Sequence, residues 1–333
     1  MKKNAPITII RVLAMISIIV GHWFKMVGIN EYQLLSIGVE IFFFVSGYLY
    51  ARKKIDQCLD WLIKRWKRLI VPFWIVVALN VIIQNGLNVW TSNQFLSLFF
   101  NLLNIQGLNR FFLFINTGSI SGMGQTWFLT ILMLSYFFML LVKRNPVIEE
   151  WIDENIFLVS FLSIVSQILL SFVGVQIIYQ ICFFIGYFLS RKKWLVRKNY
   201  LIVTMLTMLL CVGRLILKRY IDGSILYDQV ISRWSFVFLA LFIIMILIWM
   251  CDKYGSFTEK IVSSKIWMTL DLMSYPLFLT HYMFLSGNLA VNKFILDDVI
   301  MQTILFLIMM FFIACIVVAF TNWRGIKAVW KIE

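Results

Sequence analysis

Residues 7–24, ITIIRVLAMISIIVGHWF, form an apolar run long enough to cross a membrane as a helix, and they include two strongly polar side chains, Arg11 and His22. Eleven residues of α-helix turn through about 1100°, within roughly 20° of three full turns, and rise about 16 Å. Arg11 and His22 are therefore predicted to face the same side at two depths. An arginine at the centre of a membrane span costs about 2.5–3.5 kcal/mol, so it usually faces a partner or a water-filled cavity. This side of the helix is predicted to be the wall of a functional site.

The composition is that of an integral membrane protein. The 333-residue chain is 62% hydrophobic and 14% charged, with a mean hydropathy of +0.89, which is too apolar for an ordinary soluble protein. Long uninterrupted apolar runs, such as 231–250 and 299–320, favour helices over the short alternating strands of a barrel. The formal charge of +14 does not indicate a nucleic-acid partner, because most Lys and Arg fall in loops of one predicted side, as in cytoplasmic loops.

The predicted fold is an all-α bundle of about ten transmembrane helices, at 7–24, 35–51, 70–90, 126–142, 156–172, 177–190, 200–217, 234–251, 269–287 and 299–320. An even number of spans places both termini on one side. The basic segments 51–68 and 191–198 share that side, which is expected to be the cytoplasm. The start MKKNAP has no A-x-A cleavage signal, so the first span is expected to be retained. Residues 1–333 are expected to form one multi-pass domain of a plasma membrane, with no soluble domain appended.

Two further segments bear on this topology. Residues 91–125 form the longest predicted outside loop, and 95–117 within it are apolar but interrupted by Asn, Gln and Gly, which favours a re-entrant or interfacial segment over a span.

The five cysteines fall in spans or inner loops, so no disulfide framework is expected. These cysteines are Cys58, Cys182, Cys211, Cys251 and Cys315.

Three ionisable side chains in the predicted outer halves of spans could carry chemistry. Glu40 lies a few residues into the second span, at a predicted depth similar to that of His22. A contact between them would fix the imidazole tautomer and favour a general base; alternatively, Glu40 contacts water or Lys25 at the interface. His281, the second of two histidines, is predicted at the same level, either in a shared polar cavity or packed among interfacial aromatics.

The segment 53–72, KKIDQCLDWLIKRWKRLIVP, is predicted to be an amphipathic helix at the inner surface. Contact with anionic lipid is the ordinary role of such a helix. Arg65 and Arg68, three residues apart, share a face and could instead hold phosphates bidentately. At the other side, Trp127 opens the fourth span, where an aromatic residue either anchors the helix or stacks on a sugar ring.

Taken together, these segments resemble the transmembrane acyltransferase family 3. Arg11 and His22 match its R-x10-H motif. The segment GVEIFFFVSGYL (38–49) matches its GV-acidic-xFF-x-xSGF/YL motif, with Glu40 at the acidic position. RWKRLIVP (65–72), WFL (127–129) and SYPLFLTH (274–281) follow in the family's order. Phe278 replaces the usual tyrosine of the last segment.

The resemblance implies a membrane O-acyltransferase that moves an acyl group, most often acetyl, from cytoplasmic acyl-coenzyme A to a hydroxyl of a capsule polysaccharide, an exopolysaccharide or a lipid-linked precursor. No metal is implied. Possible partners besides the glycan and membrane lipid are a second copy of the chain or a glycan-assembly complex. The residues implied are His22, Glu40 and His281 for catalysis, Arg11, Arg65, Arg68 and Ser46 for the acyl-coenzyme A, and Trp127 and Tyr48 for the acceptor.

Alternatives stay open at this point. A succinyl donor would need a cation for its distal carboxylate, and the sequence singles none out. A polysaccharide transporter or flippase also carries intramembrane charges, although the chain has no visible internal repeat. A polymerase of repeat units usually depends on a large outside loop, whereas 91–125 is modest and carries a single charge, Arg110.

Overall fold

The structure is a computed structural model that describes residues 5–29, 32–85, 92–114, 116, 120–192, 200–295 and 298–330. In this part of the chain the regular elements are helices, and one isolated β-bridge joins Phe112 to Val175. The longer helices are α1 (Ala5–Met26), α3 (Gly38–Ala51), α4 (Cys58–Asn80), α5 (Ser92–Leu102), α7 (Trp127–Arg144), α9 (Ile156–Phe172), α10 (Ile178–Lys192), α11 (Tyr200–Ile221), α12 (Ser232–Lys253), α14 (Lys265–Thr280) and α15 (Val299–Trp330). The shorter ones are α2 (Tyr32–Leu35), α6 (Leu108–Phe111), α8 (Pro146–Glu154) and α13 (Gly255–Ser263), with π-helical turns η1 (Val81–Asn85) and η4 (Leu226–Ile231) and 3-10 turns η2 (Gly124–Thr126), η5 (His281–Phe284) and η6 (Val291–Lys293).

Each of the ten predicted spans overlaps a helix of the structure, but these helices differ in length. Among the described residues, six helices are long and apolar enough to cross a membrane, or up to seven if α8 and α9, related by a 94° bend, form one span. Helices α3, α9, α10 and α14 have 14, 17, 15 and 16 residues, against about 20 for a full crossing. The all-helical prediction is confirmed, and the number of ten spans stays a prediction.

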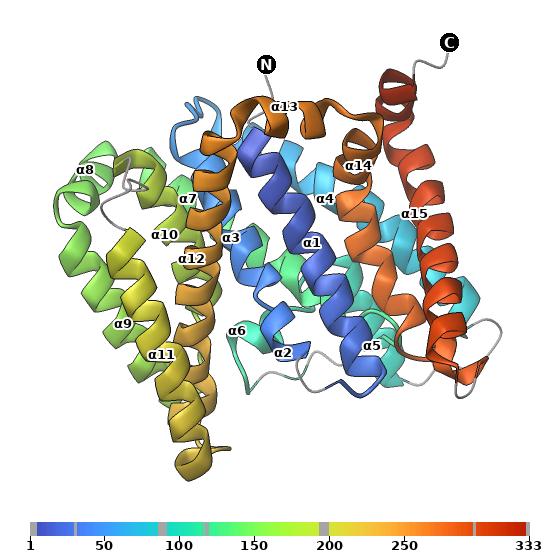
Figure 1. The fold of residues 1–333 in the computed structure, drawn as a ribbon, viewed down its shortest axis with the longest axis horizontal. Coiled ribbons are helices and arrows are strands. Elements are labelled where there is room, and N and C mark those ends of the chain that lie inside the picture. Colours follow the sequence, from blue (N-terminus) through green and yellow to red (C-terminus); the bar gives the residue numbers. More distant parts are fainter. Residues whose placement is uncertain are drawn as a thin grey trace.

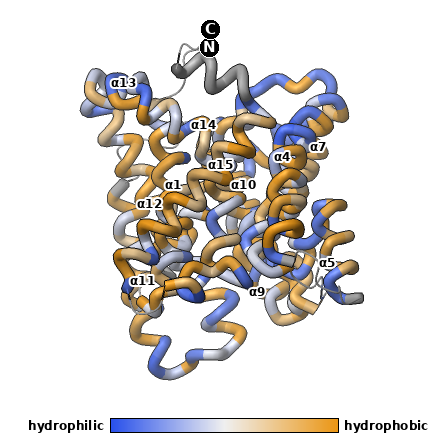
Figure 2. Tube along the Cα trace, turned by 90° about the vertical axis from the view of Figure 1, so that its right-hand side faces the viewer, coloured by the Kyte–Doolittle hydropathy of each residue, from blue (hydrophilic) through white to orange (hydrophobic). Residues whose placement is uncertain are grey.

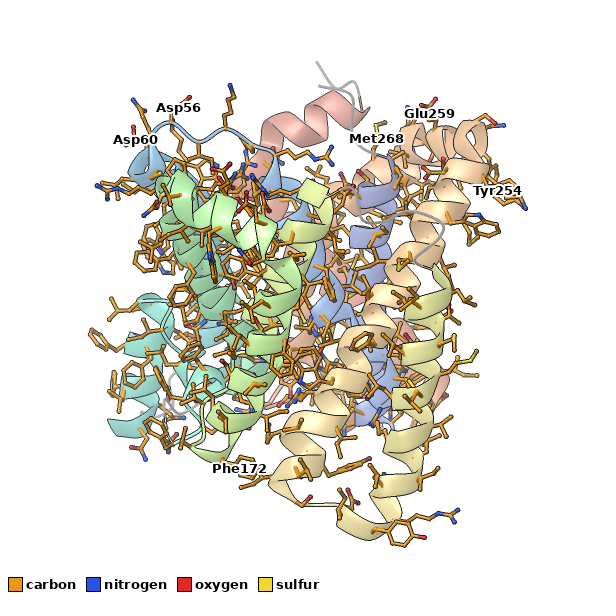
Figure 3. All side chains as sticks on the ribbon, turned by 90° about the vertical axis from the view of Figure 1, so that its left-hand side faces the viewer. Asp56, Asp60, Phe172, Tyr254, Glu259 and Met268 are labelled. Carbon is orange, nitrogen blue, oxygen red and sulfur yellow. The ribbon has the colours of Figure 1, made fainter. Side chains whose placement is uncertain are left out.

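The bundle has two ends, and both the beginning of α1 and the end of α15 lie at one of them (Figure 1). We call this the proximal end and the opposite one, where α1 ends at Met26, the distal end. Asp56, Asp60 and Glu259 are at the proximal end, whereas Phe172 lies toward the distal end (Figure 3). Between the ends, the long helices are predominantly hydrophobic (Figure 2).

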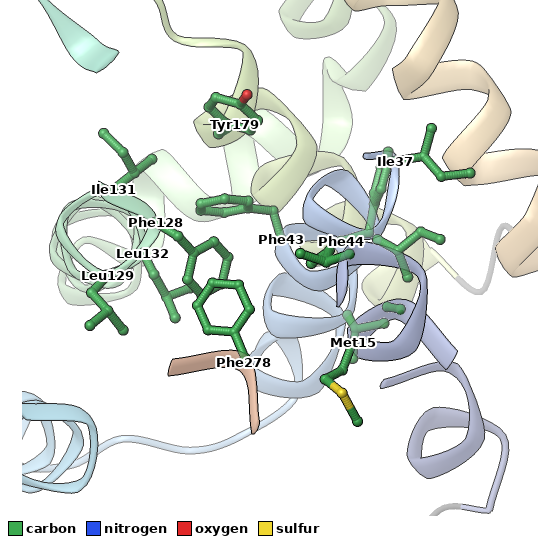
Figure 4. Packing of buried hydrophobic residues seen from close by; sticks show 14 of the residues in the cluster. Met15, Ile37, Phe43, Phe44, Phe128, Leu129, Ile131, Leu132, Tyr179 and Phe278 are labelled. Atoms are coloured by element: carbon green, nitrogen blue, oxygen red, sulfur yellow. The ribbon is translucent and has the colours of Figure 1, made fainter. Parts of the chain in front are cut away.

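Glycines allow the closest helix contact in the core, between α3 and α10. A Cβ at Gly47 would be 1.9 Å from the Phe183 carbonyl oxygen, and one at Gly186 would be 2.0 Å from the Phe44 carbonyl oxygen. Small residues at such interfaces let helix backbones approach closely, which is how helices associate in a membrane. Around this contact, aromatic side chains from several helices fill the interior, including Phe43, Phe128 and Phe278 (Figure 4).

Two predictions about connecting segments have different outcomes. Residues 58–68 are not a separate surface helix but the first three turns of α4, which continues through Pro72 to Asn80; the apolar run after Arg68 lets the helix extend without interruption. By contrast, α5 and α6 in the predicted loop 91–125 have only 11 and 4 residues. They lie at the distal end (Figure 1) and are not among the candidate spans, as expected for 95–117 within the described residues.

Candidate active site

The two histidines of the chain contact each other at the distal end. His22 near the end of α1 and His281 just after α14 place Nδ1 and Nε2 2.8 Å apart. His281 is fully buried, whereas His22 is partly exposed. The Tyr282 ring packs edge-on against His22, with ring centroids 5.2 Å apart. The predicted common level of His22 and His281 is therefore confirmed, in a shared polar contact.

The hydrogen bonds of this pair define its tautomers. His281 Nδ1 is 2.6 Å from the Phe278 carbonyl oxygen, which only accepts, so Nδ1 carries the proton and donates. In neutral His281 the other nitrogen, Nε2, is then an acceptor, and the Nδ1–H of His22 donates to it. This leaves Nε2 of His22 unprotonated, with its lone pair directed away from His281. A nitrogen held in this state is what a general base requires.

Buried amides brace the segment that carries His281. Gln125 in η2 donates through Nε2 to the Leu279 carbonyl at 2.7 Å, and Gln84 in the π-helical turn η1 donates to the Met283 carbonyl at 3.0 Å. Gln84 also accepts from the Asn288 backbone N–H at 3.0 Å. Two elements distant in the sequence, η1 and η2, thus hold the backbone on both sides of His281. The π-helical turn η1, which carries Gln84, directly follows the end of α4.

A second pair joins the same two helices nearer the proximal end. Arg11 of α1 forms an ion pair with Asp271 of α14, so the predicted common face of Arg11 and His22 is confirmed, and this face meets α14. The Asp271 side chain is 6% exposed and that of Arg11 is 37% exposed. With five N–H donors, Arg11 can keep the ion pair and also contact a bound anion.

Glu40 is not part of the histidine pair. The predicted contact between Glu40 and His22 is not made in the structure, because the bond of His22 runs to His281. The carbonyl of Leu35 accepts from Ser17, five residues before His22. The connection after α1 therefore turns back into the bundle before α3 begins, so Glu40 lies deeper in the bundle than counting residues inward from the two span ends predicts. Glu40 instead interacts electrostatically with Arg233 of α12.

Arg65 and Ser46, two of the residues predicted to bind the acyl-coenzyme A, lie in one cluster near the proximal end. The Arg65 guanidinium lies 4.7 Å from the Tyr50 ring centroid and 5.4 Å from that of Trp61. Tyr136 of α7 interacts electrostatically with Arg65, and its hydroxyl also interacts with Ser46. Arg65 is half-buried in this cluster, while Arg68 is exposed. The structure therefore separates two arginines that share a face by sequence spacing alone.

The two predicted acceptor residues lie apart. Trp127 is at the distal start of α7, where its ring is 4.9 Å from that of Tyr179 and 5.7 Å from the Arg110 guanidinium. Tyr48 instead lines an apolar pocket together with Ile7 and Ile10, toward the proximal end. The structure thus places Trp127, and not Tyr48, at the end of the bundle that holds His22.

Several residues of these clusters were not singled out from the sequence. Asp271 is a charged residue within the predicted span 269–287, and no role was assigned to it. The i, i+4 spacing of Trp61 with Arg65 and of Ser46 with Tyr50 was the available signal for the cluster around Arg65. No local pattern points to Gln84 or to the other residues that brace or surround the histidines, which are Tyr282, Gln125 and Asn288. Among the described residues, no group of three His, Cys, Asp or Glu side chains could hold a metal ion.

Comparison with known proteins identifies the family of the chain. A family model described as an acyltransferase domain matches residues 4–322, which is nearly the whole chain. No curated protein and no solved structure matches the chain. The match covers the arginine and histidine of α1, the bracing amides and His281, and it favours an acyltransferase over a transporter, a flippase or a polymerase. The chain thus belongs to the membrane acyltransferase family 3.

Proposed function

We propose that this acyltransferase moves an acyl group, most simply acetyl, from cytoplasmic acyl-coenzyme A to a hydroxyl of a cell-surface polysaccharide or its lipid-linked precursor. The observation that carries the proposal is the pair of bonds from His22 to His281 and from His281 to the Phe278 carbonyl, 2.8 and 2.6 Å long. They leave Nε2 of His22 as a base at the partly exposed end of the pair.

In the proposed reaction, Nε2 of His22 accepts the proton of the acceptor hydroxyl while the hydroxyl oxygen attacks the thioester carbonyl carbon. The carbon–sulfur bond breaks, and the leaving thiolate takes the proton from His22. The products are an ester on the glycan and free coenzyme A. His281 stabilises the transient imidazolium of His22, because its Nε2 accepts the hydrogen bond from the Nδ1–H. This is the part that a buried acceptor plays in other His-based acyl transfer.

The acyl-coenzyme A is proposed to approach from the proximal end, taken as cytoplasmic because basic loops surround it. Arg65 and Arg68 are suited to its phosphates, and Ser46 lies beside the same cluster. The Tyr275 hydroxyl donates to the Leu69 carbonyl at 2.7 Å, which places α14 and α4 at the same level there. Tyr275 lies six residues before His281, and Leu69 lies four residues after Arg65. At 1.5 Å per helical residue, Arg65 and His281 are about 15 Å apart along the bundle. A donor held at one level must therefore extend along the bundle to reach the other.

The test is acyl transfer by purified protein in lipid nanodiscs, with [14C]acetyl-coenzyme A and de-esterified surface polysaccharide. Wild-type protein should move label to the glycan, and His22→Ala should reduce the rate by about 100-fold or more, the usual contribution of a general base. Label that stays in the thioester with wild-type protein would refute the proposal. Succinyl-coenzyme A in a parallel reaction distinguishes the two donors.

The arginines allow a separate measurement. Replacing Arg65 and Arg68 by Ala should raise the KM for acetyl-coenzyme A, with a smaller effect on the amount of inserted protein. The double variant Lys64→Ala, Lys67→Ala removes the same charge from exposed positions of the same helix and is the matched control. Equal effects of the two double variants would show that these arginines serve only as lipid contacts.

A further inference from the structure

A second polar cluster lies at the distal end, on the other side of the aromatic core from the histidines. Arg233 at the start of α12 donates to the Tyr179 hydroxyl at 3.1 Å. The Tyr179 ring is 4.9 Å from that of Trp127, and Glu40 interacts electrostatically with Arg233. We call Glu40, Trp127, Tyr179 and Arg233 the distal cluster. It draws one residue from each of four helices, α3, α7, α10 and α12.

This cluster has more hydrogen-bonding capacity than the described residues use. Glu40 is 3% exposed, and its Oε2 has no hydrogen-bond partner among them. Arg233 has five N–H donors, and within the described part of the chain it makes one hydrogen bond, to Tyr179. Outside the cluster, the next residue of α10, Gln180, is also buried, with 6% exposed, and has partners for neither side-chain atom in the described part of the chain. Leaving such groups unpaired in the interior is costly, so the cluster favours a polar ligand.

The chemistry of the cluster fits a sugar. Trp127 and Tyr179 supply adjacent aromatic rings, which combine a large apolar face with a polar tip. The Arg233 guanidinium offers donors, and the Glu40 carboxylate offers acceptors, to the hydroxyls of a ligand. Trp127 and Arg233 are partly exposed, so this side of the cluster can meet a ligand, while buried Glu40 lies behind it. The charges of Glu40 and Arg233 offset each other, which favours a neutral hydroxyl-bearing ring over an anion.

Aromatic contacts connect the cluster to the histidine pair. The Phe43 ring lies 5.3 Å from that of Tyr179 and 5.0 Å from that of Phe128. Phe278 follows at 5.3 Å from Phe128 and 5.7 Å from His281. Tyr179, Phe43, Phe128 and Phe278 can be followed in this order in Figure 4. These rings therefore lie between the two polar clusters.

We propose that Arg233, Tyr179 and Trp127, supported by Glu40, form a subsite that holds a sugar ring of the acceptor away from the ring that is acylated. This inference rests on the proposed function, because it assumes a glycan acceptor. It assigns Glu40 to acceptor binding through Arg233 and not to the orientation of His22. An acceptor of several rings would occupy both clusters, whereas a single ring beside His22 would not reach the distal cluster.

The experiment measures equilibrium binding of fluorescently labelled, de-esterified surface polysaccharide to nanodisc-embedded protein without donor, and then the KM and kcat of acyl transfer. Arg233→Gln should weaken binding and raise the acceptor KM by about tenfold or more, the usual effect of losing a charge-assisted hydrogen bond, with kcat at saturating glycan retained. Tyr179→Phe, which removes only the hydroxyl, should have a smaller effect in the same direction.

The matched control is Arg214→Gln on α11, whose guanidinium lies 4.3 Å from the Phe236 ring centroid; it should leave glycan binding unchanged. Unchanged binding in Arg233→Gln, or a loss of kcat together with a lower thermal unfolding temperature, would overturn the inference and make the cluster a structural clamp. The proposed function is tested separately, with wild-type protein alone. If wild-type protein binds the glycan but transfers no labelled acetyl group to it, the proposed function fails.

Discussion

Replacement of His281 by Asn or by Gln tests the direction of the hydrogen bonds in the histidine pair. The Nδ2 of an asparagine takes nearly the place of Nδ1 in histidine, so His281→Asn can still donate to the Phe278 carbonyl, but it is too short to reach His22. A glutamine extends to the place of Nε2, so His281→Gln can accept from the Nδ1–H of His22 but loses the bond to Phe278. The two variants thus each keep one of the two bonds, which are 2.8 and 2.6 Å long.

If His22 is the base, the bond between the histidines is the one that catalysis needs. Loss of an acceptor for a buried N–H costs about 1–3 kcal/mol, which corresponds to a rate reduction of about 5- to 150-fold. We expect His281→Asn to lower kcat within this range and His281→Gln to retain a rate within about tenfold of wild type, with the KM for acetyl-coenzyme A unchanged in both. The assay is the labelled-acetate transfer, with thermal unfolding as the check on folding. A faster Asn than Gln variant would refute the assigned tautomers.

Three further predictions concern the bundle around the pair. Arg11→Gln should destabilise the protein by about 1–3 kcal/mol, and by more than Asp271→Asn does. Arg11→Gln leaves the carboxylate of Asp271, whose side chain is only 6% exposed, without the Arg11 charge, whereas the Arg11 side chain left by Asp271→Asn is 37% exposed and can be hydrated. Thermal unfolding in detergent measures both variants. Gly47→Ala places a Cβ 1.9 Å from a backbone carbonyl of α10 and should cost about 1–3 kcal/mol, whereas Gly213→Ala, with nothing within 4 Å, should cost nothing in the same scan. Gln125→Leu removes the 2.7 Å bond to the backbone before His281 and should lower kcat several-fold without changing the donor KM, and an unchanged kcat would show that this amide has no positioning role.

Local periodicity was sufficient to predict the face of the first helix. The spacing of Arg11 and His22 fixes their relative direction on any regular helix, and α1 is regular from Ala5 to Met26. The all-helical fold could likewise be predicted, but from composition. A long apolar run in a membrane must satisfy its backbone hydrogen bonds internally, and a helix does so.

The depth of Glu40 could not be predicted, because it depends on the path of a connection. Counting residues inward from the ends of two spans assumes that both spans begin at the same surface. Here the short helix α2 returns into the bundle, and its last residue, Leu35, bonds with Ser17 at 2.7 Å. The connection uses residues that the hydropathy pattern assigns to the second span, so Glu40 lies deeper in the bundle than the count predicts.

The pairing of α1 with α14 depends on an irregularity in the second helix. Asp271 and His281 are ten residues apart, which on a regular α-helix leaves them about 80° from a common direction, so the spacing alone assigns them to different neighbours. Pro276 interrupts the hydrogen bonds of α14, and the chain tightens to a 3-10 turn at His281, where each residue turns further than in an α-helix. Both changes alter the direction of His281 relative to Asp271, and the two residues then meet Arg11 and His22 on one face of α1. Because the helices are joined at two levels about 15 Å apart, neither can rotate about its axis without breaking a polar contact. The ion pair near the proximal end therefore helps to fix the direction of the His22 imidazole at the distal end.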